Sequence, residues 1–440
     1  MVVVSFSVGS LSASVRAEGS SEFVNAARSV PRCTISGRVL ESAGGLGLTI
    51  AIHAAACSGR VLSVDGEVAI ASDVSADSGA DIAGSTWVLP LDPDDPFDRA
   101  RRAAGAVVAL DPIALEVGPV RGFFHRAAAW LRSSLRDATS DLDPRAGALM
   151  RGLTIGDTSG LDQPTTDRLR AAGLSHLVAV SGSNVAIVVG AVTVATRRSP
   201  LRRRVALAAG ALGLFVVVVG PDPSVLRAAA MGSIGLWALS LGRRVEPLHG
   251  LAVALIVVIA ARPAIVSSLG LHLSAAATAG IVLWAGAIAG KLRRLPAPVA
   301  LVLGVTLAAQ LAVAPILIAG FGEISIVAPL TNLLAAPAVP VATMAGLAAS
   351  VIGLVSGGAA DLLAALAAPF VRWVLLIGDL GGAHPHARLQ LPSWTALVVA
   401  VPVLACALGS LSKAFEPALG SGRERIPVGD AGRGGQRTES

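Results

Sequence analysis

Residues Gly152–Gly190 read GLTIGDTSGLDQPTTDRLRAAGLSHLVAVSGSNVAIVVG. The stretch begins polar and ends as an apolar run that starts at Leu174, directly after the helix breaker Gly173. Residues 162–170 have the pattern of a short amphipathic helix outside a bilayer, whereas the apolar run has that of a membrane span. Polar side chains at this changeover are costly in hydrocarbon unless they find partners or face a water-filled path.

Those polar side chains make up the first candidate site. At helical spacing His176, Ser183 and Asn184 fall on one face of the predicted span, with Ser181 toward its edge. Gly182 between them would let backbones or a substrate approach closely. We therefore predict that this face lines a polar path through the protein.

The composition predicts a membrane protein. Of the 440 residues 53% are hydrophobic and only 15% are charged, and several apolar runs are long enough to cross a bilayer. We expect a polytopic α-helical protein with about nine spans and a short re-entrant segment at Ile324–Ala336. The predicted spans are Leu174–Thr196, Val205–Val219, Val225–Leu241, Leu248–Ala261, Ser267–Gly290, Val299–Phe321, Val339–Val355, Leu362–Leu380 and Thr395–Leu411.

The chain before the first span has a different character. Short β-type runs, TISGRVLES, LGLTIAIHAA, RVLSVDGEVAIAS and STWVLPL, are separated by Gly, Ser and Asp, which is typical of a small barrel or sandwich. The following stretch Arg121–Arg136 places aromatic and aliphatic side chains on one side of a helix and most of its arginines on the other. This pattern favours a basic helix on the membrane surface, and the alternative is a helix that packs on the membrane bundle itself.

The basic loops predict the topology. Arginine and lysine gather at residues 197–204, 243–244 and 291–294, which lie on the same side when the spans are counted. By the positive-inside rule that side is cytoplasmic, so the β domain lies outside and the C-terminal tail inside. We divide the chain into a short N-terminal segment (1–28), an extracellular β domain (29–118), amphipathic surface helices (119–172), a membrane domain (173–412) and a disordered cytoplasmic tail (413–440).

Four segments in a fixed order carry a resemblance to a known family. They are GD-SGL followed by GLSHLVAVSGSNVAIVVG, then GPDPSVLRAAAMGSI, then ARPAIVSSLGLHLSAAATAGIVL, and finally QLAVAPILIAGFGEISIVAPLTNLLAAPAVP. Together they resemble the ComEC-type competence protein family over most of residues 141–340. Members often read S-G-L-H where this chain has Ser-Gly-Ser-Asn at 181–184. Many also end in a metallo-β-lactamase-like domain, and we expect a form without it.

The resemblance implies a function that the residues alone do not reach. It implies a DNA-internalisation channel that passes single-stranded DNA into the cytoplasm during natural transformation, with an OB-like β domain outside. It also implies a cytoplasmic motor ATPase, a DNA receptor and a separate nuclease as partners. From the residues alone, Arg227, Gln310 and Asn332 extend the candidate path, because polar and charged groups within spans mark substrate routes.

Other functions stay open. A small-solute or lipid-precursor transporter would use the same bundle without any DNA contact, and a degenerate, non-conducting family member would act as a membrane-anchored binding module. The sequence has no P-loop and no H-E-x-x-H motif, and we expect no enzymatic activity, cofactor or metal.

Two cysteines of the β domain form the last candidate site. Cys33 and Cys57 share an exported, oxidising location, which favours a disulfide, while two unpaired core cysteines are the alternative.

Overall fold

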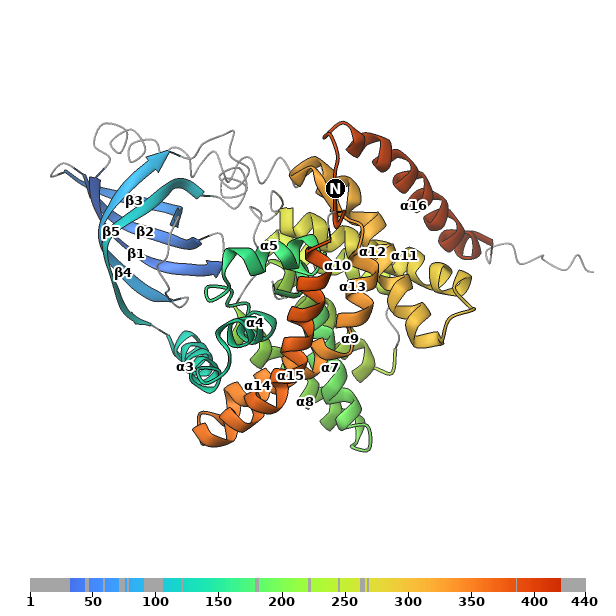
Figure 1. Ribbon diagram of the computed structural model, residues 1–440, viewed down its shortest axis with the longest axis horizontal. Coiled ribbons are helices and arrows are strands. Elements are labelled where there is room, and N and C mark those ends of the chain that lie inside the picture. The colour runs from blue at the N-terminus through green and yellow to red at the C-terminus, as the bar shows by residue number, and fades with distance from the viewer. Residues whose placement is uncertain are drawn as a thin grey trace, which may run out of the picture.

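The computed structural model of the chain describes residues 32–43, 47–57, 60–70, 76, 79–90, 106–120, 122–178, 182–220, 223–243, 246–261, 266, 269–384 and 386–420. It has an N-terminal β barrel beside a helical bundle, with α3, α4 and α5 lying between the barrel and the long apolar helices (Figure 1). A mostly helical chain with an N-terminal β region is thereby confirmed.

The barrel consists of β1 (Arg32–Ala43), β2 (Gly47–Cys57), β3 (Arg60–Ile70), β4 (Ala80–Pro90) and β5 (Ala106–Val120). The strand order in the closed sheet is β1-β2-β3-β5-β4, and only the β3–β5 pairing is parallel. Alternate residues such as Ile35, Ile52 and Ile82 fill the interior, as the period of two requires.

The four β-type runs of the sequence correspond to β1–β4, but β5 has no such alternating pattern. It carries Pro112, which pairs with Thr86 next to a register shift in the β4–β5 ladder. Prolines within sheets are confined to such irregular places, and this is why the pattern alone does not predict the strand.

Cys33 and Cys57 lie directly opposite each other on β1 and β2. The structure joins them in a disulfide, with the two Cα atoms 4.4 Å apart. The bridge is buried within the barrel and clips the first hairpin. Residues 1–28, which we predicted as a separate segment, lie outside the described residues, as does the part of the predicted tail beyond residue 420. Residues 413–420 of that tail belong to a helix, so the prediction of disorder is wrong for them.

The bundle begins with α3 (Phe123–Ala138), α4 (Pro144–Ile155), α5 (Gln163–Ala171), α6 (Ser175–Val178) and α7 (Gly182–Ala195). It continues with α8 (Leu201–Val219), α9 (Pro223–Ser240), α10 (Pro247–Ala261), α11 (Leu269–Lys291) and α12 (Ala297–Phe321). Then follow β6 (Glu323–Ser325), α13 (Ala328–Ala335), α14 (Ala338–Ile352), α15 (Gly357–Gly382), β7 (Arg388–Gln390) and α16 (Thr395–Gly420). β6 and β7 pair as a small antiparallel sheet.

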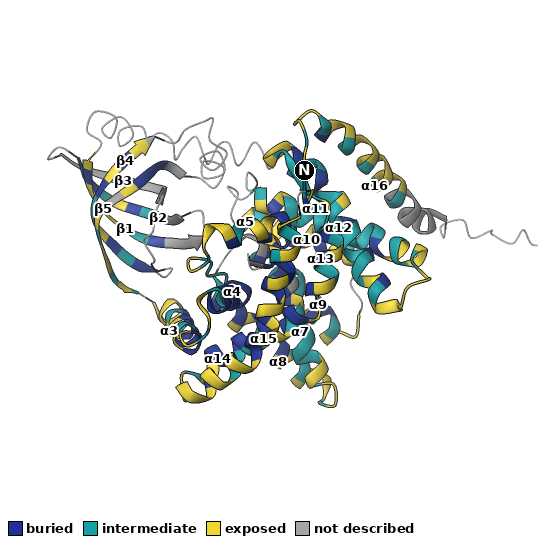
Figure 2. Cartoon of the chain, viewed as in Figure 1, coloured by how far each residue is buried: buried dark blue, intermediate teal, exposed yellow. Residues whose placement is uncertain are grey.

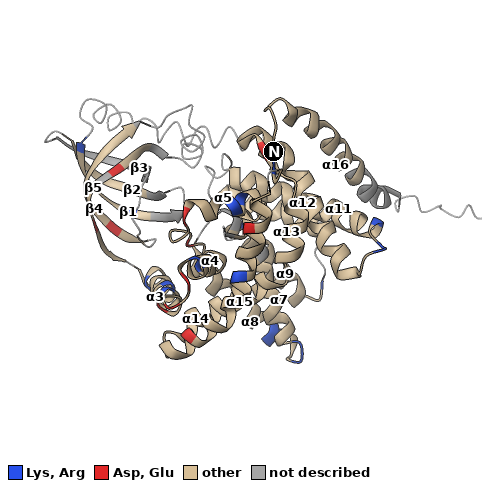
Figure 3. Ribbon diagram, in the orientation of Figure 1, with Lys and Arg blue, Asp and Glu red and all other residues tan. Residues whose placement is uncertain are grey.

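Within the described residues, α11, α12 and α15 are long and apolar enough to cross a membrane. Helices α13 and α14, which meet at 50°, make a fourth if the bent pair is one span. Charged residues lie on α3, α4 and α5 and in a few loops and helix ends, whereas the long helices α11 and α12 are largely uncharged (Figure 3). The remaining predicted spans correspond to shorter helices, among them α9 and α10, so the structure supports a membrane protein without reproducing all nine spans.

The first predicted span, Leu174–Thr196, corresponds to two helices, α6 and α7, and residues 179–181 between them lie outside the described residues. A tight turn at Gly173, with φ +72°, precedes α6, and Gly182 at the start of α7 lies against α9.

Helix α3 packs on the bundle, as the alternative prediction states, while a position on the membrane surface stays a prediction. Ala128, Leu131, Leu135 and Ala138 are buried, and the Ser350 hydroxyl of α14 donates to the Leu131 carbonyl at 2.6 Å. The largest apolar cluster runs from α3 through α4 to α14 and α15, so it joins residues on both sides of our expected boundary at 172/173 (Figure 2).

Candidate functional site

Two of the family-like segments meet at the turn between α5 and α6. The three successive carbonyl oxygens of Ala171–Gly173 accept hydrogen bonds from the segment that begins at the end of β6: from Ser325 Oγ at 2.8 Å, Thr331 Oγ1 at 2.6 Å and Asn332 Nδ2 at 3.5 Å. The two segments are 159 residues apart in the chain. Carbonyl groups at a break between helices need such partners, because no helix hydrogen bond satisfies them.

Gly173 is required at this turn for two reasons. Its φ of +72° is rarely adopted by residues with a side chain, and a Cβ there would clash with the Cβ of Ala328 at the start of α13. The turn and the short helix α13 therefore approach backbone to backbone, which fixes the position of α6 and of His176 on it.

Gln310 on α12 joins the same cluster from the other side. Its Nε2 donates to the Ser325 carbonyl at 2.6 Å, and its Oε1 is buried without a hydrogen-bond partner. Asn332 also donates to the Ala328 carbonyl at 2.8 Å within its own helix. The structure thus brings together Gln310 and Asn332, which lie in different predicted elements.

A second polar cluster lies between α7, α9 and α11. Arg227 is only 4% exposed, and its Nη1 donates to Thr278 Oγ1 at 2.5 Å, while its Nε has no partner. A Cβ on Gly182 would lie 2.9 Å from Arg227 Nη2, so this glycine makes room for the guanidinium. Arg227 is therefore held inside the bundle rather than presented at an open mouth.

Asn184 has a structural partner that the sequence does not reveal. It is 1% exposed, and its Nδ2 donates at 2.9 Å to the carbonyl of Leu153, close to the C-terminus of α4. Its Oδ1 is buried without a partner. Asn184 thus caps the C-terminal end of α4, and it has this structural role whether or not it lines a path.

The structure does not place the candidate residues on one face. His176 is exposed on α6, whereas Asn184 is buried on α7. Ser181 lies outside the described residues, as does the side chain of Ser183. The candidate path residues therefore do not share one face. They gather instead in two polar clusters, one around Gln310 and Asn332 and the other around Gly182 and Arg227.

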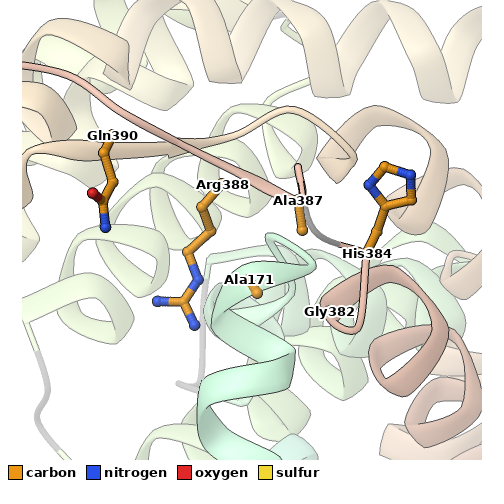
Figure 4. Close-up of a pocket in the computed structure, with 6 residues that line it drawn as sticks. All are labelled: Ala171, Gly382, His384, Ala387, Arg388 and Gln390. Atoms are coloured by element: carbon orange, nitrogen blue, oxygen red, sulfur yellow. The ribbon is translucent and has the colours of Figure 1, made fainter.

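Next to the first cluster, with which it shares Ala171, lies an open cleft of about 480 Å³. The polar side chains of His384, Arg388 and Gln390 line it together with Ala171, Gly382 and Ala387 (Figure 4). Arg388 also pairs with Glu323 Oε2 at 3.3 Å and donates to the Asp167 carbonyl at 3.0 Å. The guanidinium is thereby held at the cleft by contacts to β6 and α5.

A further charged group ties α4 and α5 to α15. Asp379 accepts from Arg145 Nη2 at 2.9 Å and from Arg168 Nη1 at 3.2 Å. The hydrogen bond to Asp379 raises the pKa of Arg145 against the opposing effect of burial. These two ion pairs hold α4 and α5 against α15.

Residues 153–415 match the competence protein family, and this range is more than half of the 440-residue chain. The chain belongs to the competence protein family. It is also 27% identical over 213 residues to ComE operon protein 3 of Bacillus subtilis (strain 168), an alignment that covers 48% of this chain and 27% of that protein. No solved structure matches the chain.

The family-like GD-SGL motif precedes the turn and has a structural explanation. Gly156 ends α4 in the left-handed conformation, with φ 76°. Asp157 Oδ1 accepts from the Ser159 hydroxyl at 2.6 Å and backbone N–H at 3.2 Å, and Oδ2 lies 3.3 Å from Arg136 Nε on α3. Burial acts to raise the pKa of Asp157, but the bonds from Ser159 and the charge of Arg136 outweigh it, so the pKa lies below its ordinary value.

Sequence reasoning did not assign Arg388, Gln390 or Glu323 to a site. The signal was weak, because β6 and β7 are three residues each and pair across 65 residues of chain. Among the described residues no group of three or more His, Cys, Asp or Glu could hold a metal.

Proposed function

We propose that this member of the competence protein family is a membrane channel that passes single-stranded DNA into the cytoplasm during natural transformation. The observation that carries the proposal is the set of hydrogen bonds between Ala171–Gly173 and Ser325–Asn332, which we call the joint. Ala171 and Ser325 lie inside the region matched by the family, and Ala171 also lines the donor-rich cleft. A polyanion leaving water needs donors in place of its hydration shell, and the cleft offers a guanidinium, an imidazole and an amide.

The proposal includes a direction. The barrel would lie outside and act as an OB-like domain, for which its closed five-stranded sheet is the support. The loops with Arg197–Arg204, Arg243 and Lys291–Arg294 would be cytoplasmic. The nine predicted spans, several too short to cross alone, would share the hydrocarbon region within one bundle.

The candidate path residues keep distinct proposed roles. Arg388, His384 and Gln390 would meet the phosphates first, because charge-assisted donors bind them most strongly. The path would continue past His176, Gln310 and Asn332, and then past Gly182 and Arg227 with the flanking positions Ser181, Ser183 and Asn184. Because Arg227 is buried in this structure, passage would require the contact between α7 and α9 to open.

Passage would depend on partners outside this chain. The sequence has no P-loop, so we propose that a cytoplasmic motor ATPase supplies the driving force. A DNA receptor would deliver the strand, and a separate nuclease would degrade its complement.

Two experiments test the proposal. Cells whose own channel gene is deleted should regain uptake of labelled DNA when they express this chain, and unchanged uptake of labelled small solutes would separate a channel for DNA from a transporter for solutes. For the direction, single cysteines at Ser199 and Glu116 in a Cys406→Ser background should be labelled only from inside and only from outside, respectively. Labelling of position 199 in intact cells would reverse the proposed topology.

A further inference from the structure

The helices α8 and α9 leave a groove between them on the surface of the bundle. The groove has a volume of about 490 Å³. Its wall on α8 consists of Val205, Ala209, Leu212, Gly213 and Val216. These positions recur every three or four residues, so they form one stripe along the helix.

The wall on α9 has the same spacing and is slightly more polar. It consists of Ala229, Ser233, Leu236, Trp237 and Ser240. Since α8 and α9 are antiparallel neighbours, Ser240 at the end of α9 lies at the same end of the groove as Val205 at the start of α8. From Val205 to Val216 the α8 stripe is about 16 Å long, roughly half of a hydrocarbon core of about 30 Å. The groove therefore has the length of one leaflet.

The end of the groove at Val205 and Ser240 is basic. Arg202 precedes Val205 by about one helical turn on the same stripe, and Arg243 follows Ser240 by three residues; both side chains are exposed. Within the described part of the chain, Arg202, Arg203 and Arg243 make no ion pair, and the buried Nε of Arg204 has no hydrogen-bond partner. Helix α8 also begins here, and cations at a helix N-terminus are destabilised by the macrodipole. An anion bound at this end would neutralise the unpaired arginines and would also interact favourably with the positive N-terminus of α8.

An apolar groove as long as one leaflet, with an unpaired basic end, fits one class of ligand. We propose that the groove between α8 and α9 binds an anionic phospholipid, with an acyl chain along the two stripes and the phosphate between Arg202 and Arg243. Trp237, 67% exposed, lies on the groove wall near that end, where indole rings favour the interface. The inference rests on the proposed placement of α8 and α9 in the bilayer and does not depend on passage of DNA.

The test uses the full chain purified in detergent. Added phosphatidylglycerol should raise its melting temperature more than phosphatidylcholine does, and native mass spectrometry should show about thirtyfold tighter retention of the anionic lipid, given about 1 kcal/mol for each arginine. Arg202→Gln with Arg243→Gln should remove this preference. The matched control, Arg293→Gln with Arg294→Gln, changes a basic loop that does not line this groove and should keep the preference for the anionic lipid.

The apolar part is tested by filling the groove. A Cβ on Gly213 meets nothing within 4 Å, so Gly213→Leu should fold and exclude both lipids. Gly235 is equally open but does not line the groove, and Gly235→Leu should retain binding. Equal retention of the two lipids by the unaltered chain would overturn the proposal, as would an equal loss in the two arginine variants. The same stabilisation by inorganic phosphate or a short DNA strand alone, or a dimer that Gly213→Leu dissolves, would assign the groove to another occupant.

Discussion

Single residues of the family-like motifs turn out to stabilise the fold as well as to mark a site. Asn184 satisfies a carbonyl of α4, Asp157 connects α3 to the loop after α4, and Gly173 allows a turn that no other residue fits without strain. The sequence predicts that such residues matter, because polar groups beside apolar runs need partners. It does not predict which carbonyl or guanidinium they contact, since those partners come from distant helices.

Asn184→Leu is expected to destabilise the protein, in contrast to a residue that only lines a path. The change leaves the Leu153 carbonyl buried without its donor, which costs about 1–3 kcal/mol. Thermal unfolding of the purified chain measures it, with Thr193→Val on the same helix as control, because Thr193 bonds only to Gly190 within that helix. If Asn184→Leu has the same melting temperature as the unaltered protein, the capping role is refuted.

Asp157→Asn should lower stability at neutral pH by about 1–2 kcal/mol, because its carboxylate is bonded to Ser159 and paired with Arg136. The folded pKa of Asp157 lies below the unfolded value of about 3.9, so its contribution is present above that pH and is lost as pH falls through the folded pKa. The melting temperatures of variant and parent should therefore converge as the pH falls through the folded pKa of Asp157. Asp137→Asn, an exposed change on α3, should have little effect at either pH.

At the scale of elements, the sequence predicts most helices and the strands β1–β4, and it misses elements whose form depends on contacts. Helix α3 has the amphipathic pattern of a membrane-surface helix, yet its apolar side meets α14 and α8. Periodicity shows that a helix has an apolar face and does not show what covers it. Likewise β5 contains prolines, and the apolar run that reads as one span corresponds to the two helices α6 and α7.

Arg132 on α3 provides the test of this packing. It is buried, and it donates from Nε to the Val218 carbonyl at 2.8 Å and from Nη2 to the Val219 carbonyl at 3.1 Å, which caps the C-terminus of α8. Arg132→Met should destabilise the protein by about 1.5–3 kcal/mol, the range for hydrogen bonds that involve a charged group. Arg126→Met, on the exposed side of α3, should cost far less. Equal melting temperatures for the two variants would show that the hydrogen bonds of Arg132 do not hold α3 on the bundle, and would contradict this packing.

For the whole molecule, composition alone predicts a membrane protein, and the order of four motifs predicts the family that the comparison shows. The bundle brings the first and last of these motifs together across 159 residues of chain. This joint could not be deduced from spacing, because it depends on how α12, α13 and α15 pack around the turn after α5. The cleft beside it is formed by Ala171 and by residues between Gly382 and Gln390, where the sequence has no periodic pattern that predicts a site.

The most direct measurement of the central claim compares DNA uptake by cells that express Arg388→Gln, Glu323→Gln, Arg170→Gln or the unaltered chain at matched membrane levels. If Arg388 meets the phosphates of the strand, its loss should lower uptake at least about tenfold, since a charge-assisted bond contributes about 1.5–3 kcal/mol. Glu323→Gln should maintain or raise uptake, because it removes the carboxylate that competes for the same guanidinium. Arg170→Gln, an exposed arginine at the end of α5 that does not line the cleft, should leave uptake unchanged. Equal losses in Arg388→Gln and Glu323→Gln would show that the pair only holds β6 to β7, and would contradict a DNA path through this cleft.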